Sequence, residues 1–168
     1  ATSHLQVYEN SQVAFEFNTV NGGPLRRTPS MRDLVRGVMF NPTWTSPDSI
    51  ALKDKIPLIQ RDPNAFKRLR MHLLDRVTGQ VVDETTVDWT QNPFEITRKY
   101  LFRMDPGPDN ALGIVKFPLS NPDNIYMHDT NERDLFQYAY RLKSSGCIRL
   151  EKPLDLAFYL ISKDVWTA

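Results

Sequence analysis

The 168-residue sequence has a single cysteine, Cys147, and only three histidines. One cysteine cannot form an internal disulfide, and so few cysteines and histidines leave little material for a metal site. No apolar run approaches the roughly eighteen residues that a transmembrane helix needs, and the first ten residues lack the pattern of a signal peptide. We therefore expect no membrane-spanning segment, no metal and no cofactor in this chain.

Excess charge of either sign is also missing. Lysine and arginine number 21 against 20 acidic residues, which gives a net charge of +1. This balance provides no global attraction to nucleic acid. The chain has twelve prolines against seven glycines, and 11% aromatic residues. These features predict one loop-rich domain, mainly β with helices and therefore of the α+β class.

Hydrophobic periodicity places the expected elements. Alternating apolar residues on both sides of residues 9–11 predict a β-hairpin over residues 5–17 with one buried face. Further strands are expected at residues 35–40, 71–75, 80–83, 112–117 and 148–150, and helices are expected to begin at Ser46, Asp62 and Pro153. The last helix should pack on the sheet through Leu156, Leu160 and Ile161. Gly113 predicts a bulge or a close approach of the backbone.

The residues with reactive side chains lie in the segment 125–150. Cys147 ends a tight turn that begins at Ser144, and His128 lies nineteen residues upstream. A free thiol is only a few per cent ionised at pH 7, so a nucleophilic cysteine needs a base or a positive environment. The amides of Gly146 and Cys147 are expected to point at a developing oxyanion, and Arg149 supplies a fixed positive charge nearby.

A lone cysteine is more often a small buried hydrophobe than a nucleophile. A glycine directly before Cys147 and an arginine two residues after it are unusual neighbours for a core residue. Apolar residues at helical spacing predict a short helix over residues 134–143, which would return the chain to the turn. We therefore expect the imidazole of His128 and the thiol of Cys147 to lie within hydrogen-bond reach.

The same residues resemble a known signature. His128, followed after a gap by Ser-x-Gly-Cys-x-Arg at residues 144–149, is similar to the motif of the L,D-transpeptidase (YkuD-type) catalytic domain family. The stretches NALGIVKF at residues 110–117 and YMHDT at residues 126–130 resemble the YcbB-like branch of large periplasmic members. Ser145 stands where many family members carry a second histidine, and that branch commonly has serine there.

The resemblance implies a fold and a place in the cell. The expected fold is a YkuD-type β-sandwich or barrel core within a single domain over residues 1–168. A mixed helix and strand insertion over about residues 41–104 would cap it, and the catalytic motifs would lie within residues 105–150. Such a cap would exclude water and favour transfer of a thioester to an amine over hydrolysis. We further expect a fragment of a longer exported, periplasmic protein whose signal or anchor lies outside this chain.

The resemblance also implies a reaction. Cys147 would attack the third residue of a peptidoglycan tetrapeptide stem, release the terminal D-alanine and pass the acyl group to the side-chain amine of an acceptor stem. His128 would transfer protons, held by the backbone carbonyl of Asp129. Carbapenem β-lactams are expected to acylate the same thiolate, and cell-wall synthesis proteins are expected partners. Substrate contacts are expected from Tyr126, Arg149, Ser144 and Ser145, with Tyr126 forming a wall and Arg149 orienting the turn.

Three alternatives remain open. Water in place of the acceptor amine would make the chain an L,D-carboxypeptidase. A sortase-like transpeptidase also combines histidine, cysteine and arginine, but its cysteine lies in a different local motif. A non-catalytic wall-binding module is the third. Two further features are assigned no firm role: His72 has no partners for a metal site, and the pair Arg26 and Arg27 fits either a solvated loop or a substrate contact.

Overall fold

A computed structural model describes residues 3–163 of the chain and divides it into two compact units. The split unit comprises Ala1–Pro42 and Ala111–Ala168, and the inserted unit comprises Thr43–Asn110. Each unit contains its own sheet with short helices, so the predicted α+β class is confirmed. No helix among residues 3–163 is both long and apolar enough to cross a membrane.

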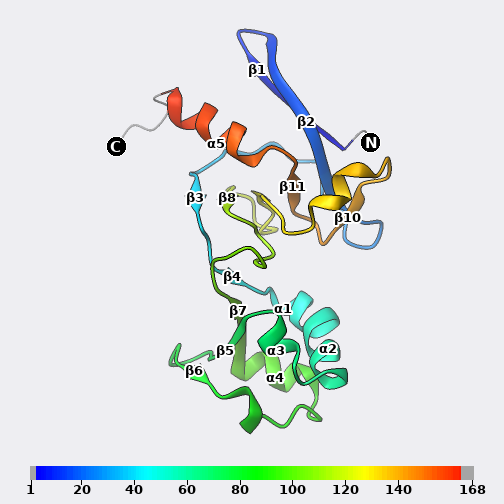
Figure 1. Cartoon of the computed structure of the whole chain (residues 1–168), viewed down its shortest axis with the longest axis vertical. Helices are drawn as coiled ribbons and strands as arrows, with labels where there is room; N and C mark the ends of the chain where they lie inside the picture. The colour runs from blue at the N-terminus through cyan, green and yellow to red at the C-terminus, as the bar shows by residue number, and fades with distance from the viewer. Residues whose placement is uncertain (1–2, 164–168) are drawn as a thin grey trace. The chain divides into compact units, whose positions relative to one another are not determined.

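A seven-stranded sheet forms the split unit (Figure 1). Its order is β1-β2-β11-β9-β8-β3, with β10 also pairing to β2. The strands are β1 His4–Glu9, β2 Gln12–Gly22, β3 Met39–Phe40, β8 Val115–Phe117, β9 Met127–His128, β10 Leu142–Ser144 and β11 Ile148–Leu150. The antiparallel pairing of β1 with β2 confirms the predicted hairpin. Its turn uses Asn10 and Ser11 at positive φ, +49° and +65°.

One face of this sheet is apolar because side chains alternate along each strand. Val115 and Phe117 of β8 and Leu150 of β11 are fully buried on it. Helix α5, Pro153–Ser162, which is orange to red in Figure 1, packs on them through Leu156 and Ala157. Burial of each large apolar side chain contributes about 1.5–3 kcal/mol. The predicted packing of the last helix is therefore confirmed, although the side chain of Ile161 lies 44% exposed rather than against the sheet.

Three predicted elements of the split unit differ from the structure. The strand expected at residues 112–117 is only Val115–Phe117, because residues 111–114 form a turn. The strand expected at residues 35–40 is paired only at Met39–Phe40, because its neighbour β8 is itself only three residues long. The helix expected at residues 134–143 is a 3-10 helix, η3 Arg133–Gln137. It ends there because the carbonyl of Arg141 accepts a bond from the amide of Asn21, at 2.9 Å, so the chain joins β2 as β10.

The inserted unit has a four-stranded sheet in the order β4-β7-β5-β6. The strands are β4 Trp44–Thr45, β5 Met71–Asp75, β6 Val81–Val82 and β7 Tyr100–Met104, of which β5 and β6 confirm the predicted pair. The helices are α1 Asp48–Ile50, η1 Ala51–Lys55, α2 Ile56–Arg61, α3 Ala65–Arg68, η2 Glu84–Thr86 and α4 Pro93–Lys99. The helix predicted from Ser46 thus starts at Asp48, with η1 in π-helical form. The rings of Phe66, Trp89 and Phe102 pack together in the core.

Candidate active site

The polar face of the β8-β9-β11 sheet carries the reactive side chains. Antiparallel pairing sets Lys116 of β8 opposite His128 of β9, and parallel pairing sets Arg149 of β11 beside the same histidine. The strand residues directly before His128 and Arg149, which are Met127 and Ile148, pack on the apolar core instead. Because side chains alternate, Lys116, His128 and Arg149 form a row on the opposite face.

His128 is a buried, neutral base in this row. Its side chain is only 5% exposed, and its Nδ1 contacts the backbone carbonyl oxygen of Asp129. A carbonyl can only accept, so Nδ1 carries the proton and Nε2 is the basic nitrogen. Burial, together with the charges of Arg149 and Lys116, lowers the pKa of His128 to about 3, against an opposing effect of the Asp129 carbonyl.

The side chain of Asp129 fixes the position of that carbonyl. Its Oδ2 accepts a hydrogen bond from the amide of Ile114 at 3.0 Å, and its Oδ1 accepts one from Nη1 of Arg133 at 2.7 Å. Gly113 has φ +59°, and a Cβ built there would lie 2.2 Å from Oδ2 of Asp129. The predicted close approach at Gly113 is confirmed, and the group that approaches is the carboxylate of Asp129.

The thiol of Cys147 is partly buried and donates a weak hydrogen bond. Its Sγ donates to the carbonyl oxygen of Asn124 at 3.9 Å. Among the hydrogen bonds of residues 3–163, none joins Sγ to His128, so the expected direct contact is not formed. Burial raises the pKa of the Cys147 thiol, while hydrogen bonds from Tyr126 and the charges of Lys116 and Arg149 oppose the rise. The thiol is therefore protonated at neutral pH.

The turn before Cys147 is held by its own side chains. Ser144 is buried, and its hydroxyl donates to the carbonyl of Cys147 at 2.5 Å and accepts from the amide of Gly146 at 3.2 Å. This geometry gives Ser144 a structural role within the turn, and its substrate contact remains a prediction. The Ser144 hydroxyl also engages the Gly146 amide, and the expected role of that amide toward an oxyanion remains a prediction. The Cys147 amide takes no part in these bonds, and Gly146 itself has φ +121°.

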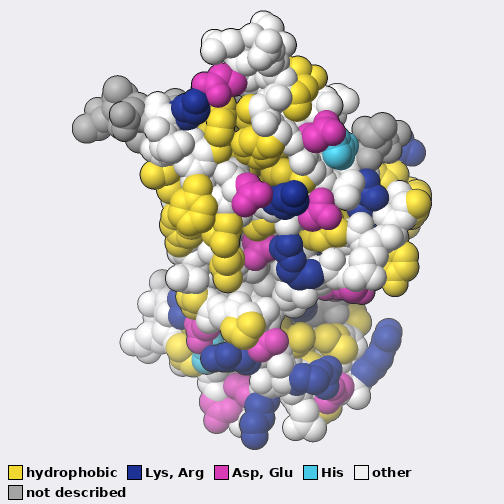
Figure 2. Space-filling model, turned by 45° about the horizontal axis from the view of Figure 1, so that its top comes forward, with side chains coloured by type: hydrophobic (Ala, Val, Ile, Leu, Met, Phe, Trp, Pro, Cys, Tyr) yellow, Lys and Arg dark blue, Asp and Glu magenta, His cyan; other side chains and the backbone are white. Residues whose placement is uncertain are grey.

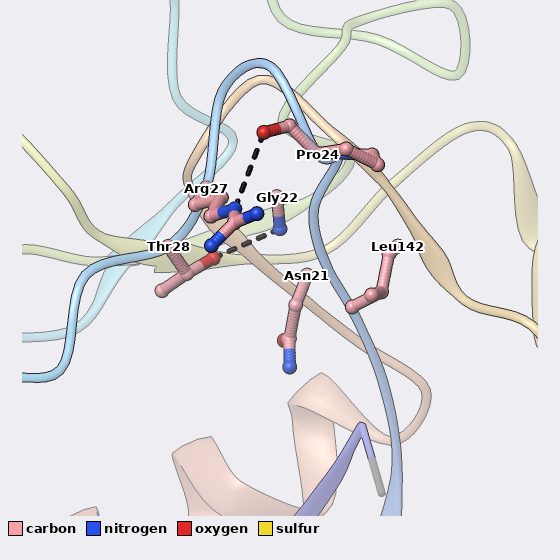
Figure 3. A pocket seen from close by; sticks show the side chains of 6 residues that line it. All are labelled: Asn21, Gly22, Pro24, Arg27, Thr28 and Leu142. Carbon is pink, nitrogen blue, oxygen red and sulfur yellow. Dashed lines mark hydrogen bonds between the residues drawn. The ribbon is translucent and has the colours of Figure 1, made fainter. Parts of the chain in front are cut away.

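The loop after β2 braces the same turn, a connection that the sequence did not reveal. Thr28 donates its hydroxyl to the carbonyl of Gly146 at 2.7 Å and accepts from the amide of Gly22 at 2.9 Å, the second bond being drawn in Figure 3. Arg26 donates through Nη1 to the hydroxyl of Ser145 at 2.9 Å. Beside these contacts lies a pocket of about 290 Å³ lined by Asn21, Gly22, Pro24, Arg27, Thr28 and Leu142 (Figure 3).

Two of the remaining candidates lie in the row or next to it. Arg149 forms an ion pair with Glu132, so its charge is already partnered. The ring of Tyr126 lies 5.6 Å from the ring of His128, centroid to centroid. Sequence reasoning missed Lys116, although a signal was present: Lys116 is the one charged residue within the apolar run 112–117. Its Nζ lies 4.0 Å from the centroid of the Tyr126 ring.

Charge is mixed elsewhere on the surface. On the face shown in Figure 2, the basic and acidic side chains of the described residues are interspersed rather than gathered by sign. Residues 3–163 contain no group of three or more acidic, cysteine or histidine side chains that could hold a metal ion. The expectation that this chain binds no nucleic acid remains a prediction.

Comparison with known proteins agrees with the sequence motif. Residues 1–165 match the family model described as "YkuD: L,D-transpeptidase catalytic domain". A Haemophilus influenzae protein named "Putative L,D-transpeptidase" is 36% identical over 164 residues, which is 97% of this chain and 32% of that relative. The chain therefore spans about a third of the length of the curated relative that it matches.

Proposed function

Because the chain belongs to the YkuD family of L,D-transpeptidase catalytic domains, we propose that it forms 3→3 cross-links between peptidoglycan stems through a thioester on Cys147. The observation that carries this proposal is the shared face of β9 and β11. Strand β9 holds a buried neutral histidine, His128, whose Nε2 is the basic nitrogen, and Cys147, the only cysteine of the chain, directly precedes β11. A thiol and an imidazole base are the two groups that cysteine acyl transfer requires.

The first half of the reaction forms the acyl-enzyme. Nε2 of His128 takes the thiol proton as Sγ of Cys147 attacks the carbonyl carbon of the third stem residue. The amides of Cys147 and Gly146 donate to the oxyanion, the Gly146 amide leaving its bond to Ser144 to do so. As the intermediate collapses, the imidazolium gives its proton to the leaving amine of D-alanine, and a thioester remains. The lowered pKa of His128 makes this imidazolium a strong acid for that step.

The second half returns the enzyme to its starting state. The side-chain amine of the third residue of an acceptor stem attacks the thioester carbon, and His128 takes the proton that this amine loses. Collapse expels Sγ, which recovers a proton from His128. The Asp129 carbonyl keeps the ring in one tautomer throughout, and Asp129 itself is anchored by Ile114 and Arg133.

The finer assignments belong to the same proposal. We place the chain in the YcbB-like branch on its stretches at residues 110–117 and 126–130, and we place it in the periplasm, where peptidoglycan is cross-linked. Carbapenems, which carry a strained acyl group, are proposed to acylate Cys147, and cell-wall synthesis proteins are proposed to supply the stems.

Incubation with a purified disaccharide tetrapeptide tests the reaction, with products separated by liquid chromatography and mass spectrometry. We expect free D-alanine together with a 3→3 dimer, and we expect neither with Cys147→Ala, which removes the nucleophile. Tripeptide monomer without dimer would favour the L,D-carboxypeptidase alternative. Absence of both products from the folded wild-type chain would favour a non-catalytic wall-binding module.

A further inference from the structure

Lys116 occupies an unusual place for a lysine. It lies at the centre of β8 between Val115 and Phe117, both of which are fully buried, and its own side chain is partly buried. Strand register sets it opposite His128 on the polar face, and its ammonium lies 4.0 Å from the centroid of the Tyr126 ring. The side chain is therefore held over the site rather than extended into solvent.

The ammonium of Lys116 has no carboxylate partner among residues 3–163, whereas Arg149 in the same row is paired with Glu132. A half-buried cation without a counter-ion is unfavourable, because the ring face of Tyr126 replaces only part of the lost hydration. Burial accordingly lowers the pKa of Lys116, and the charge of Cys147 opposes that change. Of the groups that act on this ammonium, Cys147 is the one that becomes an anion during the reaction.

Before the reaction begins, an imidazolium at His128 that could stabilise a thiolate is disfavoured. In many cysteine and histidine sites the imidazolium stabilises the thiolate. Here burial, Arg149 and Lys116 all disfavour an imidazolium, so its pKa falls to about 3. Of the other charged groups near the turn, Arg149 is neutralised in part by Glu132, and Arg26 is bonded to the hydroxyl of Ser145.

We propose that Lys116 is the counter-cation of the Cys147 thiolate, kept over the site by the ring of Tyr126. Ionisation of Cys147 supplies the anion that Lys116 otherwise lacks, and the proton passes to His128 only in transit. This inference rests on the proposed function only in taking Cys147 as the reactive group. It assigns to a lysine the electrostatic role that an imidazolium holds in other cysteine enzymes.

The pH dependence of cysteine alkylation tests this assignment directly. Cys147 is the only thiol in the chain, so the rate of its reaction with iodoacetamide, followed by intact mass, reports a single site. Lys116→Met should move the midpoint of the rate upward by about one pH unit, because a single nearby charge shifts a pKa by about 1–3 units. Lys116→Arg, which keeps the charge, should restore most of the shift. Lys116→Gln replaces the methionine variant if that variant does not fold.

Lys143 offers a matched control. Its Nζ lies 4.6 Å from the centroid of the Tyr138 ring, but its side chain is exposed on β10. Lys143→Met should leave the midpoint unchanged. An unchanged midpoint in folded Lys116→Met, or equal shifts in the two methionine variants, would overturn the proposal. Alkylation requires no stem peptide, so an enzyme that fails to cross-link but shows the Lys116 shift would refute the proposed function and leave this inference standing.

Discussion

His72 of the inserted unit and His128 of the split unit both lie on strands, and the two side chains differ in their surroundings. In the inserted unit, His72 of β5 lies with Nε2 2.6 Å from Oδ2 of Asp105, and both side chains are about 40% exposed. In the split unit, His128 of β9 is buried and contacts a neutral carbonyl, with two cations in its row. The exposed His72 with its carboxylate partner is an ordinary surface pair. Burial beside cations favours the neutral form of the His128 imidazole.

The ion pairs near the candidate site differ in burial from those of the inserted unit. Those of the inserted unit, such as Arg76 with Asp48 and Arg98 with Glu95, lie on its surface. In the split unit, Asp129 is nearly buried, Arg149 is mostly buried, and both contact residues of the site. Surface ion pairs contribute little to stability, and a buried charge is costly unless it is paired and hydrogen-bonded. We therefore keep the proposed catalytic role in the split unit and give His72 a structural role.

The largest expected effect is a difference in acylation rate between variants of His128 and His72. His128→Gln should lower the rate of Cys147 acylation by about 10²–10⁴-fold, because it removes the general base. His72→Gln should change that rate by less than about twofold, since His72 lies on the exposed side of its own unit. Stopped-flow measurement of acylation by a carbapenem checks both variants. Equal losses in the two variants would contradict the division of roles.

The second prediction concerns acid stability. The pKa of His128 is about 3 in the folded chain against 6.5 in the unfolded chain. Below pH 6.5 the unfolded chain binds a proton that the folded chain excludes, so the free energy of unfolding should fall as the pH drops toward 3, by an amount on the order of 4 kcal/mol. Urea unfolding of wild type and His128→Gln across this range isolates the effect. Parallel curves for the two proteins would show that burial of His128 has no such cost.

A pair of glycine substitutions compares the units by stability. Gly113→Ala should destabilise the chain by about 3 kcal/mol, because its Cβ would meet Oδ2 of Asp129 at 2.2 Å as well as adopting φ +59°. Gly79→Ala in the inserted unit should cost about 1 kcal/mol, since φ is +71° but no atom lies within 4 Å of the added Cβ. Chemical denaturation measures both. Acylation should also slow by about 10–100-fold in Gly113→Ala alone, because the Asp129 carbonyl that orients His128 moves.

The smallest effect concerns the surface pair of the inserted unit. A double-mutant cycle of His72→Gln and Asp105→Asn should give a coupling energy below about 1 kcal/mol, because both side chains are substantially exposed. Thermal unfolding of the four proteins provides the measurement. A coupling of several kcal/mol would mean that His72 is held as firmly as His128, and the contrast between the units would fail.

The elements that could be predicted are those with local signals. The hairpin of β1 and β2, the β5 and β6 pair and helix α5 follow from alternation, turn residues and Pro153. The helix expected at residues 134–143 was wrong because backbone bonding to Asn21 of β2 competes with helical spacing. That partner lies more than a hundred residues away, and local periodicity carries no information about it.

The candidate site shows the same limit. Cys147 and His128 could be chosen as candidates from their neighbours in the sequence. The contacts that surround them in the fold include residues that are distant in the sequence. Thr28 donates to the Gly146 carbonyl, and the Ser144 hydroxyl accepts from the Gly146 amide. Lys116 acquires its place only when β8 pairs with β9. Alternation within the run 112–117 would have put Lys116 on a polar face, but it could not have set it opposite His128.

Intact-protein mass spectrometry after incubation with a carbapenem tests most directly whether Cys147 is an activated acyl acceptor. We predict one covalent adduct per chain on wild type, located on the peptide that contains Cys147, and no adduct on Cys147→Ala. The His128→Gln variant should acquire the same adduct far more slowly. An adduct that persists in Cys147→Ala, or none on the folded wild-type chain, would contradict the assignment of Cys147 as the nucleophile.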